Sequence, residues 1–161
     1  MLARLPFPLV CATMCMVALS AGALSQEGTV WSRSSGSWSG SQTGTLAKYN
    51  SEHPNQRINI LCHISGPNPG DVAIRVTIQN ENPPPRSELT FAFAQRRYTF
   101  HTDERGNVNT ELDDQGFRGF WSDLRGSPNV TIIYEETGTR SVYPLKGAAQ
   151  TLGEDPCDIP E

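Results

Sequence analysis

The sequence lacks the short motifs that mark common catalytic and metal sites. It contains no G-x-S-x-G nucleophile elbow and no H-E-x-x-H helix, and the glycines between Ser65 and Gly70 are not followed by the Lys and Ser/Thr of a phosphate-binding loop. It also contains no C-x-x-C pair, which argues against structural zinc. We therefore expect no catalytic residue, no metal and no cofactor, and a non-enzyme is favoured while an enzyme stays open as the alternative.

Basic residues are few and scattered. The chain has 13 Lys and Arg against 17 Asp and Glu, which gives a formal net charge of −4. Proteins that bind nucleic acid or anionic lipid surfaces usually carry a basic block or stripe, and none is present here. The composition therefore argues against a nucleic-acid partner.

One apolar run approaches the length of a membrane segment, and it begins at residue 5. Arg4 precedes it, and Ala23 and Ser25 are small residues suited to cleavage before Gln26. The run has about 15 residues, whereas a spanning helix needs roughly 20. The pattern predicts a signal peptide at 1–25, a periplasmic or secreted protein, and no transmembrane anchor after cleavage.

Two other interpretations of this run stay open: an uncleaved anchor, and lipid attachment at Cys15. A lipoprotein signal has a small residue before its cysteine, and Met14 does not fit that pattern. Cleavage would remove Arg4 and no acidic residue, so the net charge would become −5.

Cleavage would also remove Cys11 and Cys15 and leave Cys62 and Cys157. Two cysteines in an exported chain most simply form a disulfide with each other. The bond would close a loop of about 95 residues, which the chain-entropy model values at about 4–5 kcal/mol. The alternatives are a metal site that uses Cys62, His63 and Cys157, or free thiols.

Most of the chain after residue 57 alternates between apolar and polar residues. Ile58, Ile60, Cys62 and Ile64 share one face, for example. This period is typical of antiparallel strands packed on one side, and the connections are rich in Gly, Pro and Asn. We predict an all-β fold, an antiparallel β-sandwich or partly open barrel with one or two short helices and one disulfide. The alternating segments are 58–64, 72–78, 88–94, 97–101 and 130–135.

The segment 26–56 precedes this predicted sandwich domain, 57–161. Ser and Gly dominate it from 32 to 44, but it also holds Trp31 and Trp38. It is interpreted as a flexible leader or as an edge hairpin that turns its tryptophans inward. A carbohydrate-stacking role for the two rings is a further alternative.

Two segments break the strand pattern. Phe117, Phe120, Trp121 and Leu124 follow helical spacing, and Gly126 begins a stop signal. The favoured interpretation is a helix that caps the sandwich. The alternative makes the first three rings an exposed binding patch.

The C-terminal segment predicts a second short helix. Its apolar residues would pack inward and deliver Cys157 to Cys62. The residues expected to face inward are Leu145, Ala149 and Leu152.

The titratable residues have no catalytic spacing. His63 and His101 occupy outward positions of predicted strands, and Glu111, Asp113 and Asp114 form an acidic cluster before the predicted helix. Solvated side chains are the simpler interpretation. A hydrolase would require His101 and the aspartates to converge in one pocket.

The order of these features resembles the invasion-associated protein B group and the type VI secretion accessory proteins, which are small periplasmic proteins of Gram-negative bacteria. A cysteine-bearing strand is followed by several more strands and then by a strand–helix–Cys ending. The resemblance implies a β-sandwich with one disulfide (Cys62, Cys157), a periplasmic location and no catalytic residue. The residues that carry the ending are Tyr143, Leu145, Gly147, Ala148, Leu152 and Cys157.

We therefore expect an exported, non-enzymatic binding or accessory module. It would contact a protein partner or a component of the cell envelope through loops and sheet edges. The alternatives are a carbohydrate-binding module that uses Trp31, Trp38 and Trp121, and a hydrolase with an unrecognised site.

Overall fold

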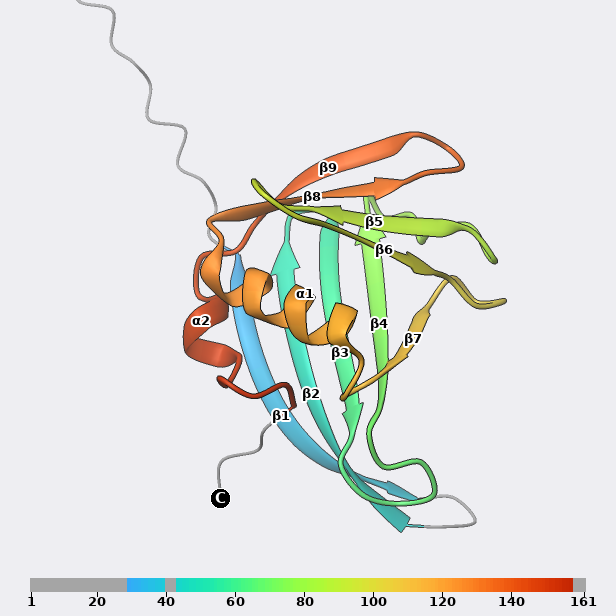
Figure 1. Ribbon diagram of the computed structural model, residues 1–161, viewed down its shortest axis with the longest axis vertical. Coiled ribbons are helices and arrows are strands. Elements are labelled where there is room, and N and C mark those ends of the chain that lie inside the picture. Colours follow the sequence, from blue (N-terminus) through green and yellow to red (C-terminus); the bar gives the residue numbers. More distant parts are fainter. Residues whose placement is uncertain (1–28, 40–42, 158–161) are drawn as a thin grey trace, which may run out of the picture.

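Figure 1 shows the computed structural model of the chain, which describes residues 29–39 and 43–157. The predicted signal peptide lies outside these residues. The strands are β1 (Val30–Ser39), β2 (Thr43–His53), β3 (Gln56–His63), β4 (Asp71–Ile78), β5 (Glu88–Ala92), β6 (Arg97–His101), β7 (Val108–Glu111), β8 (Asn129–Tyr134) and β9 (Thr139–Pro144). The helices are α1 (Gln115–Gly126) and α2 (Ala148–Thr151).

The strands form two antiparallel sheets. The five-stranded sheet has the order β1-β2-β3-β4-β7, and the four-stranded sheet has the order β6-β5-β8-β9. In Figure 1 the four-stranded sheet lies across the upper end of the other sheet, and α1 lies in front of β2 and β3. The predicted all-β sandwich with two short helices and one disulfide is confirmed.

Register explains how the alternating segments build the core. Ile58 pairs with Val76, and Ile60 pairs with Ile74, so the apolar side chains of β3 and β4 lie on the same face. All four are buried. The polar residues between them face the opposite side, as period-two alternation requires.

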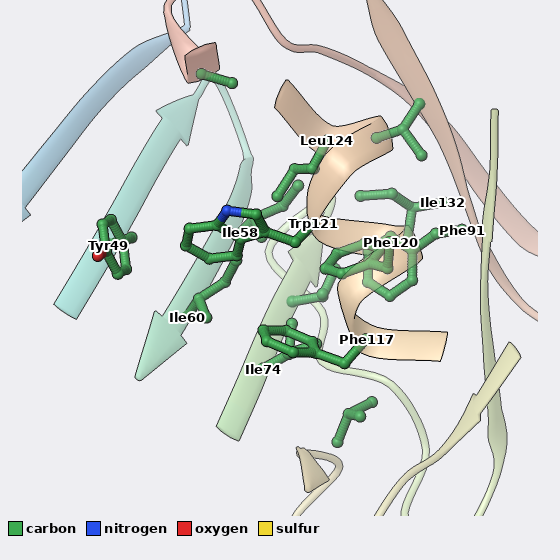
Figure 2. Packing of buried hydrophobic residues seen from close by; sticks show 14 of the residues in the cluster. Tyr49, Ile58, Ile60, Ile74, Phe91, Phe117, Phe120, Trp121, Leu124 and Ile132 are labelled. Carbon is green, nitrogen blue, oxygen red and sulfur yellow. The ribbon is translucent and has the colours of Figure 1, made fainter. Parts of the chain in front are cut away.

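Helix α1 closes the core between the sheets, as Figure 2 shows. It begins at Asp114, whose side chain accepts a hydrogen bond from the backbone N–H of Phe117 at 2.8 Å. The ring of Phe120 lies 4.7 Å from Phe91 of the four-stranded sheet, and Trp121 lies 5.2 Å from Tyr49 of the five-stranded sheet. One helix therefore packs against aromatic residues of both sheets.

Buried hydrogen bonds join the sheets at one corner. The hydroxyl groups of Ser51 on β2 and Tyr143 on β9 lie 2.6 Å apart. Burial raises the pKa of Tyr143 to about 12, so the phenol stays neutral at physiological pH. Thr29, just before β1, donates its hydroxyl to the carbonyl of Pro144 at 2.7 Å. These bonds fix the start of β1 and the end of β2 against β9.

Three details differ from the sequence-based expectations. Ala148, not Ala149, faces inward from α2, because the helix spans only four residues and begins at Ala148. Strand β7 was not predicted. The 26–56 segment is not a separate leader where it is described, since β1 pairs with β2 and β2 pairs with β3.

Candidate functional site

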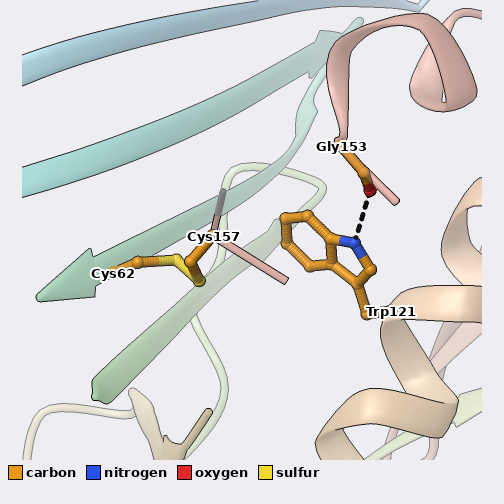
Figure 3. The surroundings of a disulfide bond; sticks show 4 residues. All are labelled: Cys62, Trp121, Gly153 and Cys157. Carbon is orange, nitrogen blue, oxygen red and sulfur yellow. Dashed lines mark hydrogen bonds between the residues drawn. A yellow bond between two sulfur atoms is a disulfide. The ribbon is translucent and has the colours of Figure 1, made fainter. Parts of the chain in front are cut away.

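The disulfide is a structural feature that holds the C-terminal segment. Cys62 and Cys157 are bonded, with their Cα atoms 5.8 Å apart, and both are buried. Figure 3 shows the adjacent anchor, in which the indole N–H of Trp121 donates to the carbonyl of Gly153 at 2.9 Å. The predicted pairing is confirmed. Both sulfurs are used by the bond, so the zinc alternative and the free-thiol alternative are wrong.

The aromatic residues of α1 do not form an exposed binding patch. Phe117 and Phe120 are 0% exposed and Trp121 is 1% exposed. They are buried because α1 turns its apolar face toward both sheets, so the interpretation as a cap describes them. Trp31 is half-buried and packs against the core. The side chain of Trp38 lies outside the described part of the chain.

The histidines and acids named from the sequence are distributed over several elements. His63 ends β3 and His101 ends β6, which belong to different sheets. Asp114 is used as the cap of α1, and Asp113 lines a cleft with Glu111 that does not include His101. Across the described residues, no group of three or more His, Cys, Asp or Glu side chains could hold a metal ion.

The outer edge of β1 is a candidate recognition element. This ten-residue strand pairs with β2 on one side and, within the described ranges, with no strand on the other. Val30, Ser32 and Ser34 are exposed, and Val30 is 66% exposed. The strand therefore presents backbone donors and acceptors to whatever lies beside it.

Natural edge strands are usually blunted by charge, proline, bulges or short length. Strand β1 is long and contains no proline, and its one charged residue, Arg33, is half-buried with its guanidinium 5.7 Å from the centre of the Tyr49 ring. By contrast, β6 has five residues, and Arg97 at its start lies 3.7 Å from Glu135. Strand β1 is thus a longer and less protected edge than β6.

Helix α2 lies beside one end of β1, as Figure 1 shows. A Cβ added at Gly147 would lie 3.6 Å from the ring of Trp31, which places the start of α2 against this tryptophan. The buried indole nitrogen of Trp31 has no hydrogen-bond partner. The disulfide-bound C-terminal segment therefore supports the inner side of the edge strand.

A cleft of about 600 Å³ opens where β1 begins and β2 turns into β3. Val30, His53 and Gln56 contribute to its lining. The His53 ring contacts Tyr143 edge-on, with the ring centres 6.0 Å apart, and the buried Nδ1 of His53 and Oε1 of Gln56 lack hydrogen-bond partners. The sequence contains no motif around His53, and only the folded turn brings these groups to the start of the edge.

A second set of interactions fixes β6 against α1. Asp123 of α1 accepts hydrogen bonds from Arg96 and from the hydroxyl of Tyr98, the latter at 2.8 Å. Burial, reinforced by this bond, raises the pKa of Tyr98 to about 12. The same carboxylate raises the pKa of the Arg96 guanidinium. These contacts tie the start of β6 to α1.

The fold and this edge define a class of protein, a disulfide-closed antiparallel β-sandwich whose ten-residue strand β1 has no strand on its outer side within the described residues. The family model YfjT matches residues 36–152, well over half of the chain. The chain therefore belongs to the YfjT family. No curated protein matched the chain, and no solved structure matched it. The resemblance to the invasion-associated protein B group stays a prediction.

No helix in the described part of the chain is long and apolar enough to span a membrane.

Proposed function

We propose that this protein is an exported, non-enzymatic binding module that captures an extended segment of a protein partner along the outer edge of β1. The observation that carries the proposal is a ten-residue edge strand with no strand partner beyond it in the described chain and no proline or exposed charge to block one. Addition of a strand to such an edge is a common mode of peptide recognition.

The surroundings of β1 support this function. Thr29 is bonded to Pro144 at one end of the strand, and Trp31 packs on α2, so β1 is held in place before a partner arrives. Preorganisation lowers the entropy lost on binding. The cleft beside Val30 and His53 gives a side chain of the incoming segment a place to dock.

The location is part of the same proposal. The predicted signal peptide, the disulfide between Cys62 and Cys157, and the resemblance to periplasmic accessory proteins all favour the periplasm or an extracellular site. A disulfide persists in an oxidising compartment, so the covalent closure suits that location.

The carbohydrate-binding and hydrolase alternatives have less support. A row of stacking rings would need exposed tryptophans, and Trp121 is 1% exposed. A hydrolase would need His101 near the aspartates, and the described cleft that contains Asp113 does not contain His101.

Site-specific photo-crosslinking tests the proposed edge. A crosslinking amino acid would replace Ser32 or Ser34 in the protein expressed in its own host, and Glu136, which is exposed on the β8–β9 turn, would serve as the control position. We expect the same protein to be captured from both β1 positions and not from Glu136. Equal capture from all three positions would contradict the proposal.

A pair of proline variants then tests whether the backbone of β1 makes the contact. Successive strand residues point their N–H groups to opposite sides, so one of Ser32→Pro and Arg33→Pro removes an N–H that faces away from β2. That variant should keep its melting temperature and lose the crosslinked partner. Undiminished capture by that variant would refute strand addition.

A further inference from the structure

We propose that the solvent-facing side of the five-stranded sheet carries a binding site for a small anionic sugar, that is, a sugar with a carboxylate or phosphate group. The site is a cleft of about 380 Å³ between the sheet, the β4–β5 connection and the β6–β7 turn. We call it the arginine cleft. Its polar lining includes Arg57, Arg75, Arg105, Asn59, Asn82 and Asn107.

Strand register assembles the sheet part of this cleft. Asn59 of β3 is paired with Arg75 of β4, and Arg57 is paired with Thr77 two residues further along. These residues alternate with buried core residues, so all four side chains lie on the solvent-facing side. Diagonal neighbours on one face of a sheet are within reach of long side chains. Arg57 and Arg75 can therefore approach the same ligand.

The β6–β7 turn supplies the third arginine from a fixed backbone. One carboxylate oxygen of Asp103 accepts the backbone N–H groups of Arg105 at 2.8 Å and Asn107 at 2.9 Å. Gly106 has a φ of 75°, and a Cβ there would lie 2.5 Å from the carbonyl oxygen of Pro83. The turn is thus closed by its own hydrogen bonds and seated against the β4–β5 connection.

The arginines of this cleft are poorly neutralised. Within the described chain, neither Arg75 nor Arg105 has an ion-pair partner. Arg57 lies 3.7 Å from Glu52, but both side chains are more than half exposed, so solvent screens the pair. The carboxylate of Asp103 is engaged by the turn. Three cations around one cleft are unusual in a chain with a net charge of −4.

The chemistry of the lining indicates the class of ligand. Guanidinium groups bind carboxylate and phosphate oxygens through paired hydrogen bonds. Asparagine side chains carry both donors and acceptors, which suit hydroxyl groups. Thr77 donates to the side-chain oxygen of Asn82 at 3.2 Å, which leaves the Asn82 amide hydrogens to donate to a ligand. A cleft with this lining fits a hydroxyl-rich anion better than an apolar molecule.

An NMR titration of the disulfide-bonded, ¹⁵N-labelled protein tests the proposal. The probes are glucose, glucose 6-phosphate, glucuronate and inorganic phosphate. At least one anionic sugar should produce saturable shifts at the amides of Asn59, Arg75 and Gly106, and glucose should produce none. Which anionic sugar binds identifies the charged group. The absence of saturable shifts with both anionic sugars would overturn the proposal.

Charge-matched variants show whether the cleft itself is responsible. Arg75→Gln and Arg105→Gln should each weaken binding of the anionic sugar about tenfold, because each removes charge-assisted hydrogen bonds. Arg140→Gln changes an exposed arginine on β9 by the same charge and should leave binding unchanged. Equal weakening by Arg140→Gln would show that only net charge matters and would refute the site.

The phosphate probe tests the sugar part of the proposal. Inorganic phosphate should bind more weakly than the anionic sugar, since it makes no hydroxyl contacts with the asparagines. If it binds as tightly as the sugar, the ligand is a simple anion and the assignment to sugars is wrong. These titrations do not involve β1, so their outcome is separate from that of the crosslinking experiment.

Discussion

The two sheets are joined to the rest of the core in different ways. The four-stranded sheet meets α1 through a cluster of rings in which Phe120 contacts Phe91, Phe93, Tyr98 and Phe100. The five-stranded sheet presents mainly Ile and Val side chains. The C-terminal segment is bonded to that sheet through the Cys62–Cys157 disulfide. Ring packing and the hydrogen bonds to Asp123 hold the four-stranded sheet to α1, whereas a covalent bond supplements packing at the five-stranded sheet.

The difference follows from the length of the elements that must be held. Helix α1 has 12 residues and buries four large side chains, so its packing area is substantial. Helix α2 has four residues, and an isolated helix of that length has no stability of its own. A short terminal segment of this kind needs a covalent bond to stay in place, whereas a longer amphipathic helix does not.

The largest expected effect on stability comes from disrupting the ring contacts between α1 and the four-stranded sheet. Phe120→Ala removes a ring that is 0% exposed and contacts rings on both β5 and β6, and we expect it to lower the free energy of unfolding by about 3–5 kcal/mol. Urea denaturation followed by circular dichroism would measure the change. Phe100→Ala, a half-buried ring of the same cluster, is the control and should lose less. Equal losses would mean that the cluster is not centred on Phe120.

The second-largest effect on stability concerns the disulfide that attaches the C-terminal segment to the five-stranded sheet. The double variant Cys62→Ala/Cys157→Ala should lose about 2–5 kcal/mol of stability, because the unfolded chain gains freedom and the tail loses its anchor. Hydrogen exchange should show that α2 opens first while β5 and β8 keep their protection. If all elements lost protection together, the disulfide would not act mainly on the C-terminal segment, and the contrast between the two sheets would be incorrect.

The smallest effect tests the turn that joins the two halves. Hydrogen bonds from the backbone N–H groups of Asn107 and Arg105 lower the pKa of Asp103 from 3.8 to about 2. Its stabilising contribution is therefore complete above pH 3.8 and is lost as the pH falls toward 2. Asp103→Asn should lower the melting temperature slightly at neutral pH.

Protonation of Asp103 makes the wild type resemble this variant, so the difference in melting temperature should shrink as the pH falls from 3.8 to 2. Melting curves from pH 7 to pH 2 would measure it. Glu104→Gln, an exposed neighbour paired with Arg86, is the matched control. A difference for Asp103→Asn that persists unchanged at pH 2 would show that the carboxylate charge does not stabilise the turn.

Much of the fold could be predicted from the sequence because several elements carry their own periodicity. The alternation around Ile58 and Ile74 marked β3 and β4, and the spacing of Phe117 and Trp121 marked α1. The two cysteines outside the predicted signal peptide predicted the disulfide. These patterns lie within single segments, so they can be recognised in the sequence without the structure.

The remaining elements depend on tertiary contacts. Strand β2 buries the polar residue Ser51, which is compatible with the interior because it is hydrogen-bonded to Tyr143. The sequence of β2 therefore lacks the regular alternation of apolar and polar residues that marks β3 and β4. Strand β7 has four residues and buries only Val108. The inward position of Ala148 depends on where α2 begins. No pattern within these segments reveals such features.

The candidate sites were still harder to predict. The arginine cleft combines residues that are far apart in the sequence, namely Arg57, Arg75 and Arg105. Only strand register and the β6–β7 turn bring them together, and the acidic composition of the chain gives no hint of them. The free edge of β1 depends on which strand ends the sheet, and that order cannot be read from a Ser-rich segment. Loops and edges were expected to matter, but the particular edge and cleft required the structure.

The position of the disulfide along the chain has a mechanical consequence. It makes a covalent ring of everything between Cys62 and Cys157, and β1 and β2 lie outside that ring. Tension applied at the N-terminal end would peel β1 and β2 from the sheet, would then draw on residues 56–61 of β3, and would reach the covalent ring at Cys62. Beyond Cys62 the disulfide carries the load, so the residues between the two cysteines cannot be extended from either end while the bond is intact.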